Sequence, residues 1–460
     1  MIAMTLAEIA AAVDGRLAAP ADADVTVDGA VEFDSRAVGP GGLFVALPGE
    51  RVDGHDFVAA AIAAGAAGAL VSHPVGALPC VVVPDVQHAL GRLATEVLRR
   101  LPAVTVVGVT GSSGKTSTKD LLAALLAVHG PTVAPPGSFN NEIGHPHTVL
   151  RADASTWFLV LECSARGAGH IRELCRIAPP AVGVVLNVGT AHLGEFGSRE
   201  AIAASKAELV EALPPSGLAV LNADDPVVLA MAGRTQARVR TVGSAPQADV
   251  RAEDVRLDPA GRAAYTLVCP GGRARVALGL HGGHHVGNSL AAAAVALELG
   301  MTLDDVAAGL AAARPASRWR MEVTDRPDGV RVVNDAYNAN PESMAAALHA
   351  LAAMAAGRRS WAVLGEMGEL GAHAADAHAE VGRLAAELGV DRLVTVGAAA
   401  RAMAVEGIAS EPVGDAAEAV VLLRGELRAG DVVLVKASRA AGLERVALDL
   451  LAPPRSEAAS

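Results

Sequence analysis

Aliphatic and β-branched residues gather in short runs along the chain, and most of these runs end in a glycine-containing or polar turn. The sharpest case is VTVVGVTG, which opens near Pro102 and passes through a glycine-rich turn into the amphipathic stretch TSTKDLLAALLAVHG. The runs WFLVLEC, AVGVVLNV and GLAVLNADD follow further along the chain. Near-continuous apolar strands are typical of a parallel sheet that helices cover on both faces. The middle of the chain therefore predicts a doubly wound α/β domain.

Two further units flank this one. Shorter strands between alanine-rich helical stretches precede it, and the strand signals VRVVNDAY, SWAVLGEM, RLVTVGA and DVVLVKAS follow it. Because 460 residues exceed what one core ordinarily holds, we expect three domains. They are a small N-terminal α/β domain (1–101), a central domain with the doubly wound parallel sheet (102–314) and a C-terminal Rossmann-like α/β domain (315–460).

Composition narrows the class of protein. Hydrophobic residues make up 52% of the chain and charged residues 19%, which is typical of a folded protein. The formal net charge of −12 argues against a nucleic-acid partner, since phosphate neutralisation needs a basic surface. Four scattered cysteines without a CxxC pair favour reduced thiols in a cytoplasmic protein. Glycines and prolines interrupt the uncharged stretch between Asp56 and Asp85, so we expect no membrane span.

The segment GVTGSSGKTS, residues 108–117, has the composition of a phosphate-binding loop. Its glycines allow successive backbone N–H groups to point at phosphate oxygens, and the following helix adds its positive N-terminus. Lys115 can reach the β- and γ-phosphates, and the Thr116 hydroxyl can hold Mg²⁺. Val109 occupies the position where this motif usually has its first glycine. The predicted strand before this loop and the predicted helix after it nevertheless favour nucleotide binding over a chance glycine-rich turn.

Polar residues follow three of the apolar runs of the central domain. Glu162 ends one strand, His192 follows the next, and Asp224 and Asp225 follow a third. Ligands of open parallel sheets bind at the carboxyl ends of the strands, where such groups can coordinate a metal ion. A solvated glutamate and a structural histidine are the alternatives. Lys206, on a polar helical stretch, looks like a surface residue from composition alone.

The order of several motifs resembles the Mur ligase family over nearly the whole chain, from Phe33 to Arg445. The segments that carry the resemblance are FDSRAVGPGGLFVALPGERVDGHDF, VTGSSGKTSTKD, FNNEIGHP, NVGTAHLGEFGS, SKAEL, LNADD, NDAYNANPESM, VLGEMGELG and VLVKASR. Within the family, DAYNANP and GEMGELG indicate the type that adds D-alanyl-D-alanine. The DYAHTPD-like and DNPR segments of the type that adds the third residue do not occur. Four positions depart mildly from the family pattern: Ser138, His285, Glu366 and Ala437.

The resemblance implies an ATP-dependent peptide ligase that joins D-Ala-D-Ala to UDP-MurNAc-tripeptide through an acyl phosphate. It further implies two Mg²⁺ ions and a carbamate made from CO₂ on Lys206. We expect a cytoplasmic protein and take a monomer as the default, while the oligomeric state stays open. The catalytic residues would be Lys115, Glu162, His192 and Lys206, of which the last three and Thr116 would hold the metal ions. ATP would contact Thr110, Gly111, Ser112, Ser113, Gly114, Lys115, Thr116, Ser117, Asn288, Arg320, Asp335 and Asn338. The UDP-linked substrate would contact Ser35 and Arg36 in the N-terminal domain and Asn140 and Asn141 in the central one.

Two other interpretations stay open from the sequence. The protein could be a ligase of the same family that adds a different amino acid or dipeptide. It could also be a regulator that binds ATP without ligating. No motif in the sequence indicates whether the third residue of the acceptor peptide is lysine or diaminopimelate.

Overall fold

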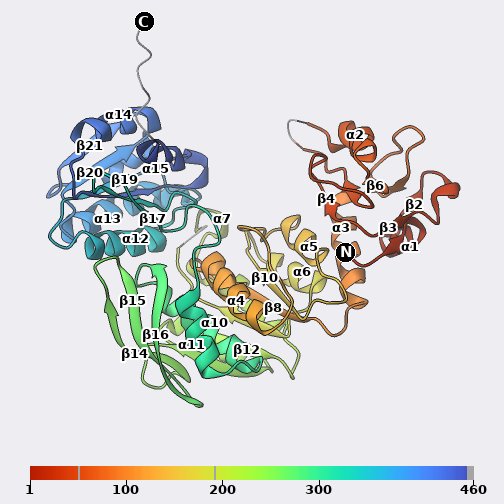
Figure 1. Cartoon of the computed structure of the whole chain (residues 1–460), viewed down its shortest axis with the longest axis horizontal. Helices are drawn as coiled ribbons and strands as arrows, with labels where there is room; N and C mark the ends of the chain where they lie inside the picture. The colour runs from red at the N-terminus through yellow and green to blue at the C-terminus, as the bar shows by residue number, and fades with distance from the viewer. Residues whose placement is uncertain (50–51, 191–192, 453–460) are drawn as a thin grey trace, which may run out of the picture.

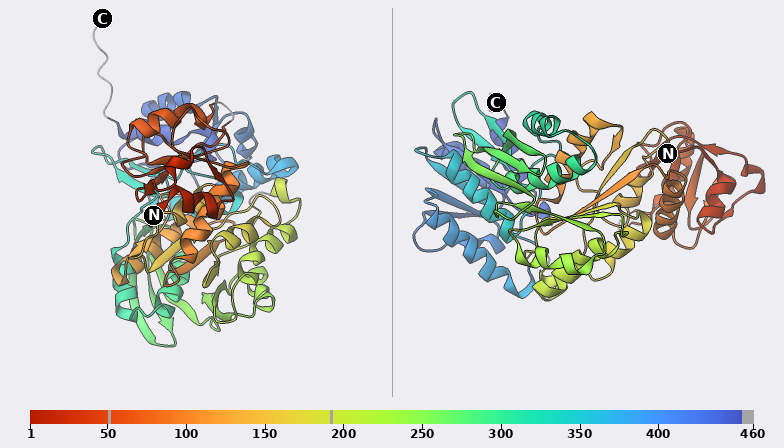
Figure 2. Two further views of the ribbon diagram at one scale, coloured as in Figure 1. Left: turned by 90° about the vertical axis from the view of Figure 1, so that its right-hand side faces the viewer. Right: turned by 90° about the horizontal axis from the view of Figure 1, so that it is seen from below.

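The computed structural model describes residues 1–49, 52–190 and 193–452, and these form three α/β domains arranged in the order of the sequence (Figure 1). The central domain lies between the other two, with the N-terminal domain at one end of an elongated molecule (Figure 2). The three-domain α/β organisation predicted from the sequence is therefore confirmed.

The N-terminal domain is built on a five-stranded sheet with the order β2-β7-β6-β5-β4, in which only β2 runs antiparallel to its neighbour. A short antiparallel pair, β1 with β3, lies beside it. The strands are β1 (Met4–Thr5), β2 (Arg16–Leu17), β3 (Thr26–Val27), β4 (Val31–Glu32), β5 (Leu43–Val45), β6 (Gly68–Val71) and β7 (Cys80–Val82). The helices are α1 (Leu6–Ala12), α2 (Val58–Ala63) and α3 (Val86–Arg99). The uncharged stretch thus forms one short helix and two buried strands, and no helix in the described part of the chain is long and apolar enough to cross a membrane.

The central domain has a nine-stranded sheet with the order β16-β15-β14-β13-β12-β11-β8-β10-β9. Its strands are β8 (Thr105–Thr110), β9 (Thr132–Val133), β10 (Phe158–Glu162), β11 (Val182–Val185), β12 (Leu218–Asn222), β13 (Arg238–Gly243), β14 (Val250–Leu257), β15 (Arg262–Cys269) and β16 (Gly272–His281). Its helices are α4 (Lys115–His129), α5 (Gly144–Val149), α6 (His170–Ile177), α7 (Leu193–Phe196), α8 (Arg199–Glu211), α9 (Pro226–Leu229), α10 (His285–Glu298) and α11 (Leu303–Ala312). Strand β10 is buried on both faces, because Val160 packs in one hydrophobic cluster and Leu159 and Leu161 in another. This explains its unbroken apolar run.

The predicted parallel arrangement holds from β9 to β14, but β15 and β16 extend the sheet antiparallel. The chain reverses directly between β14 and β15. Asp258 Oδ1 accepts hydrogen bonds from the backbone N–H groups of Ala260 and Arg262, and Gly261 takes a positive φ of 74°. Because Asp258 closes a short turn, β14 and β15 can pair antiparallel as a hairpin, without the crossover helix that a parallel pair requires.

The C-terminal domain has a six-stranded sheet with the order β17-β18-β22-β19-β20-β21, parallel except for β17. Its strands are β17 (Glu322–Asp325), β18 (Arg331–Asn334), β19 (Ser360–Leu364), β20 (Arg392–Val396), β21 (Ser410–Val413) and β22 (Val432–Lys436). Its helices are α12 (Pro341–Met354), α13 (Ala374–Glu387), α14 (Ala416–Glu426) and α15 (Glu444–Leu451). The four strands predicted here are the four inner strands of this sheet, β18, β22, β19 and β20. The two strands that the sequence did not predict, β17 and β21, lie at its edges.

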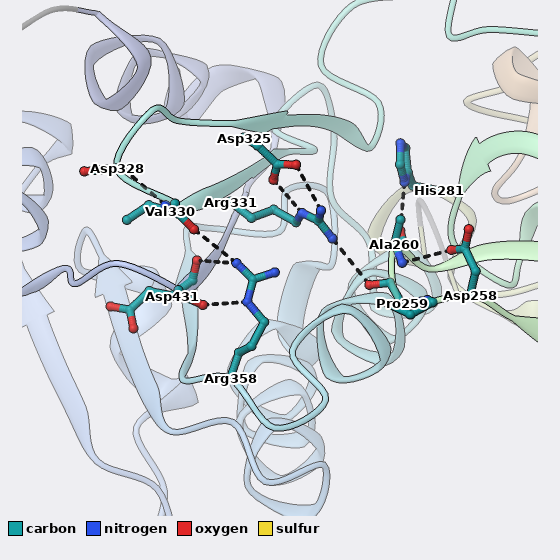
Figure 3. Close-up of polar contacts among 12 residues, drawn as sticks. Asp258, Pro259, Ala260, His281, Asp325, Asp328, Val330, Arg331, Arg358 and Asp431 are labelled. Carbon is teal, nitrogen blue, oxygen red and sulfur yellow. Dashed lines mark hydrogen bonds and ion pairs between the residues drawn. The ribbon is translucent and has the colours of Figure 1, made fainter.

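The domains are joined in different ways. The N-terminal and central domains share one hydrophobic cluster, in which Leu93 and Val97 of α3 lie with Leu159 and Ile177 of the central domain. The two clusters of the C-terminal sheet contain only residues of that domain. Away from the phosphate-binding loop, Arg331 Nη1 donates to the Pro259 carbonyl oxygen of the β14–β15 turn at 3.4 Å (Figure 3). The C-terminal domain is therefore attached largely through polar contacts.

Candidate active site

The glycine-rich loop connects β8, near the middle of the central sheet, to the N-terminus of α4. Gly114 precedes the helix with a φ of 81°, and a Cβ atom there would lie 2.5 Å from Asn288 Oδ1. Both the left-handed backbone and the close approach of Asn288 require glycine at this position. Lys115 Nζ donates to the Gly111 carbonyl oxygen at 2.7 Å, and burial lowers the pKa of this ammonium group. The loop is thus folded as a phosphate cradle.

A chain of hydrogen bonds joins the loop to the end of β10. Thr116 Oγ1 donates to Glu162 Oε2 at 2.8 Å, and Asn140 Nδ2 donates to Glu162 Oε1 at 2.8 Å. Glu162 is 1% exposed, and each of its carboxylate oxygens accepts a hydrogen bond from a protein group. Ser138 Oγ lies 2.9 Å from Thr116 Oγ1 and accepts from Arg320 Nη2 at 2.7 Å. Hydroxyl and carboxylate oxygens gathered in this way are the ligands that a hard divalent cation prefers.

A cavity of about 660 Å³ lies over the loop, between the central and C-terminal domains. Many of the residues predicted to contact ATP line it, and they come from sequence segments far apart in the chain. They are residues 112–117, Asn288, Arg320, Asp335 and Asn338, and Asn140 and Glu162 line it with them. Thr110 and Gly111 lie outside this lining, and Thr110 is completely buried.

The C-terminal wall of the cavity is organised by Lys436 at the end of β22. Its Nζ donates to Asp335 Oδ2 at 2.6 Å and to the Asn338 carbonyl oxygen at 2.8 Å. The Arg320 guanidinium stacks 4.2 Å from the centre of the Tyr337 ring. Asn340 caps α12 by accepting from the Ser343 N–H at 2.8 Å. The wall is therefore rigid and mostly polar.

Lys206 lies on α8 and is only 7% exposed. It is therefore buried, although the polar composition of the surrounding segment suggested a surface position. Burial, reinforced by the charge of Lys115, lowers its pKa to about 7 although Glu342 has the opposite effect. None of the four lysines of the chain has a freely exposed side chain. Lys119, Lys206 and Lys436 are buried, and Lys115 lies in the phosphate-binding loop.

Three predicted substrate contacts lie outside the cavity lining. Arg36 has 88% of its side chain exposed and forms an ion pair with Asp34 at 2.7 Å. That contact and the hydrogen bonds of Arg36 hold the pKa of the Asp34 carboxyl at about 2. Ser35 lies beside them, and the neighbouring Phe33 ring is 6.2 Å from that of Phe139. This places the N-terminal segment next to the loop that carries Asn140.

Asn141 and His192 remain to be placed. Asn141 Oδ1 accepts from the Gly144 N–H at 2.9 Å and so closes the turn before α5. His192 lies outside the described residues. The structure thus brings Lys115, Thr116 and Glu162 together with the C-terminal wall. The cavity lining does not include Ser35, Arg36, Asn141 or Lys206.

The sequence did not single out Asn187 or Lys436. Asn187 follows β11 and exchanges hydrogen bonds with the phosphate-binding loop, because Ser113 N donates to Asn187 Oδ1 at 2.9 Å. Both residues stand at the end of an apolar strand, where a polar side chain points to a ligand site. Asn187 follows the run AVGVVL, and Lys436 ends the run DVVLVK. Asp225, by contrast, accepts from the Val188 N–H at 2.8 Å and caps α9, so its role is structural.

An Asp–His–Ser arrangement in the N-terminal domain does not form a second active site. His55 Nδ1 lies 2.6 Å from Asp53 Oδ1, and the Ser72 hydroxyl lies 3.1 Å from His55 Nε2. The Ser72 backbone N–H, however, donates to the same Nε2 at 2.9 Å. The lone pair that would activate the hydroxyl is therefore already used, and the group fastens a turn to β6.

The fold and the cavity define a three-domain α/β protein whose phosphate-binding loop faces a second α/β domain. Residues 29–97 match the Mur ligase family catalytic domain, residues 109–296 the Mur ligase middle domain, and residues 319–439 the Mur ligase glutamate ligase domain. The chain belongs to the Mur ligase family.

Similar proteins cover the chain from end to end. The UDP-N-acetylmuramoyl-tripeptide–D-alanyl-D-alanine ligase of Mycobacterium tuberculosis is 54% identical over 98% of this chain and 98% of its own. The crystal structure of MurF from Acinetobacter baumannii has a TM-score of 0.89 and 32% identity, covering 98% of this chain and 99% of that one. MurF from Thermotoga maritima, crystallised in complex with ADP, has a TM-score of 0.81 and 33% identity, covering 91% and 96%.

Proposed function

We propose that the protein joins D-alanyl-D-alanine to UDP-N-acetylmuramoyl-tripeptide at the expense of ATP, giving the pentapeptide precursor of peptidoglycan. The observation that carries the proposal is the likeness, at 54% identity over 98% of the chain, to a ligase named for this reaction. The phosphate-binding loop, which faces the cavity between the central and C-terminal domains, supports it.

ATP is assigned to that cavity. Its phosphates would lie on residues 110–117, with Lys115 as the fixed cation. Asn288, Arg320, Asp335 and Asn338 would complete the nucleotide site, because they converge on the loop from α10 and the C-terminal domain. The ADP bound to the Thermotoga relative supports nucleotide binding by this fold.

Magnesium fits the oxygen ligands of Thr116 and Glu162, which already lie 2.8 Å apart. His192 is assigned as a further ligand on the resemblance alone. When bound, Mg²⁺ supplies positive charge that offsets the negative charge of the phosphates.

Carbamylation of Lys206 is supported by its surroundings. Only a neutral amine reacts with CO₂, and burial favours the neutral form of this side chain by lowering its pKa to about 7. The carbamate would turn a costly buried ammonium into an oxygen ligand for a second Mg²⁺ ion.

The reaction follows from the chemistry of carboxylates, which amines do not attack at useful rates. A carboxylate oxygen of the tripeptide attacks the γ-phosphorus of ATP, and the bond from that phosphorus to the leaving ADP breaks. The amine of D-Ala-D-Ala then attacks the acyl phosphate carbon, phosphate leaves, and the amine loses a proton. Lys115 and Arg320 stabilise the charge on the transferred group.

The UDP-linked substrate is assigned to the N-terminal side. Ser35 and Arg36 would hold its UDP part, and Asn140 and Asn141 its muramoyl-peptide part. The packing of Phe33 against Phe139 supports one continuous binding surface across the two domains. With these assignments we place the domain boundaries at 101/102 and 314/315 and assign the working enzyme as a cytoplasmic monomer.

The test is release of phosphate from ATP and Mg²⁺ with UDP-MurNAc-tripeptide, with and without D-Ala-D-Ala, together with mass spectrometry of the product. We expect strong dependence on the dipeptide and a product heavier by one dehydrated D-Ala-D-Ala. Parallel assays with lysine-containing and diaminopimelate-containing tripeptides would identify the acceptor. Phosphate release stimulated only by a different amino acid would instead indicate another ligase of the same family. Tight ATP binding without turnover would leave a nucleotide-binding regulator.

A further inference from the structure

The turn after β11, residues 187–190, is fastened to the phosphate-binding loop by four hydrogen bonds. Ser112 N donates to the Asn187 carbonyl oxygen at 3.1 Å, and Ser113 N donates to Asn187 Oδ1 at 2.9 Å. Asn187 Nδ2 donates back to the Ser113 carbonyl oxygen at 3.2 Å, and Gly189 N donates to Ser112 Oγ at 2.9 Å. A shift of this turn would therefore displace the N–H groups that surround phosphate.

The same turn is held from the opposite side by Glu342, which belongs to the first helical turn of α12 in the C-terminal domain. Thr190 N donates to Glu342 Oε1 at 2.6 Å, and Thr190 Oγ1 donates to the same oxygen at 3.0 Å. A Cβ atom on Gly189 would lie 2.3 Å from Glu342 Oε1, so the glycine admits the carboxylate. One acceptor thus takes two donors across a domain boundary.

The contact is partly buried and specific rather than a loose surface pair. Glu342 Oε2 is buried and has no hydrogen-bond partner within residues 1–49, 52–190 and 193–452. Burial of a carboxylate oxygen without a partner is costly, and a side chain that served only to attach the domains would be better exposed. Two residues before Glu342, Asn340 Nδ2 also reaches the phosphate-binding loop, donating to the Ser112 carbonyl oxygen at 3.3 Å.

We infer that Glu342 is a positioning residue for ATP: it fixes the turn 187–190 from the C-terminal domain, and this turn fixes the phosphate-binding loop. The inference rests on the proposed function only for its turnover readout, because nucleotide affinity can be measured without turnover.

The experiment compares Glu342→Ala, Glu342→Gln and Thr190→Val with the wild-type chain by isothermal titration with ATP and, separately, with UDP-MurNAc-tripeptide. Loss of a hydrogen-bonded charged acceptor should weaken ATP binding by roughly tenfold in Glu342→Ala. Glu342→Gln, which keeps an acceptor oxygen, should recover most of this loss. Thr190→Val, which removes only the hydroxyl donor, should lie between them. Affinity for the UDP-linked substrate should not change in any of the three.

Arg331→Gln is the matched control, because it removes the interdomain hydrogen bond to Pro259 without approaching the cavity (Figure 3). Its ATP affinity should stay within twofold of wild type, because the contact with Pro259 and the ion pair with Asp325 that it also removes both lie away from the cavity lining. Equal losses in Arg331→Gln and Glu342→Ala would overturn the inference, since general loosening of the domain would explain both. Unchanged ATP affinity in Glu342→Ala would overturn it too. Absence of dipeptide-dependent turnover in the wild-type chain would count against the proposed function and leave this binding test standing.

Discussion

Individual residues of the phosphate-binding loop are constrained by both backbone and space, and Gly114 shows this most clearly. Gly114→Ala should weaken ATP binding strongly and lower the free energy of unfolding by more than about 1 kcal/mol, because a left-handed residue gains a Cβ against Asn288. Gly389→Ala is the control: its φ is 69° and nothing lies within 4 Å of the added atom. It should show only the backbone cost, near 1 kcal/mol, with normal ATP affinity. Urea unfolding and ATP titration measure both effects, and equal behaviour of the two variants would refute the proposed steric conflict.

Lys206 gives a prediction that depends on pH. Its pKa is lowered to about 7 in the folded chain, so the unfolded chain holds the extra proton at higher pH and wild-type stability rises as pH increases above 7. At lower pH the folded protein keeps a buried ammonium. Lys206→Met should therefore gain roughly 1 kcal/mol or more near pH 6.5 and less near pH 9.5, in buffers freed of CO₂. The variant should also lose turnover. The same gain at both pH values in urea unfolding would contradict the lowered pKa.

Short sequence patterns were sufficient to predict some of these residues and insufficient for others. The loop with Lys115 and Thr116, and Glu162 at a strand end, follow from local pattern because each lies beside a recognisable element. Their proximity is now seen, while their roles stay predictions. Lys206 could be proposed only from family resemblance, since nothing in a polar helical stretch reveals which face is buried. Asn187 directly follows an apolar strand, but that position alone does not reveal its contact with the phosphate-binding loop, which spans 74 residues of sequence.

Among the elements, parallel strands were the easiest to predict. The central ones, such as β10 and β22, are buried on both faces and therefore form apolar runs, whereas β9, β13 and β21 are partly exposed and were not predicted. The hairpin β14–β16 was missed because its alternating pattern, as in VRAEDVRL, is that of a sheet with one solvated face. The edge strand β17 was missed for a similar reason, since its four residues are intermediate or exposed.

The N-terminus of α12 combines a structural and a nucleotide-directed role in one side chain. Asn340 Oδ1 caps the helix, while its Nδ2 donates to the Ser112 carbonyl oxygen. Asn340→Asp keeps the capping acceptor but sets a carboxylate oxygen against that carbonyl. We expect the free energy of unfolding to stay within about 0.5 kcal/mol while ATP affinity falls. Asn340→Ala should lose both, including about 1 kcal/mol of stability. A parallel fall of stability and affinity in Asn340→Asp would show that the two roles are not separable.

For the whole molecule, the prediction of three domains was confirmed, but their unequal attachment could not be read from the sequence. Whether an apolar helix face covers its own sheet or a neighbouring domain is decided by packing, and α3 does both. The C-terminal domain, by contrast, keeps its apolar clusters to itself.

This difference predicts two cooperative units in thermal unfolding. The N-terminal and central domains should unfold together, and the C-terminal domain separately, because only the first pair shares a hydrophobic cluster. Differential scanning calorimetry should resolve two transitions without ligand. Saturation with ATP, at about 100 times its dissociation constant, should add about 2.7 kcal/mol to the free energy of unfolding. Because both units contribute to the nucleotide site, the two transition temperatures should move closer together. A single transition in the absence of nucleotide would contradict the expected independence of the C-terminal domain.

The placement of the lysines has a consequence for chemical modification. The chain has four of them, all buried or held in the phosphate-binding loop, whereas its many arginines supply the positive charge of the outer surface. An acylating reagent such as acetic anhydride therefore meets few reactive amines other than that of Met1. Mass spectrometry of the acetylated protein should show sparse labelling, with Lys115 protected by ATP. The side-chain amines of the molecule are thus withdrawn from its outer surface, including that of Lys119, which pairs with Asp120.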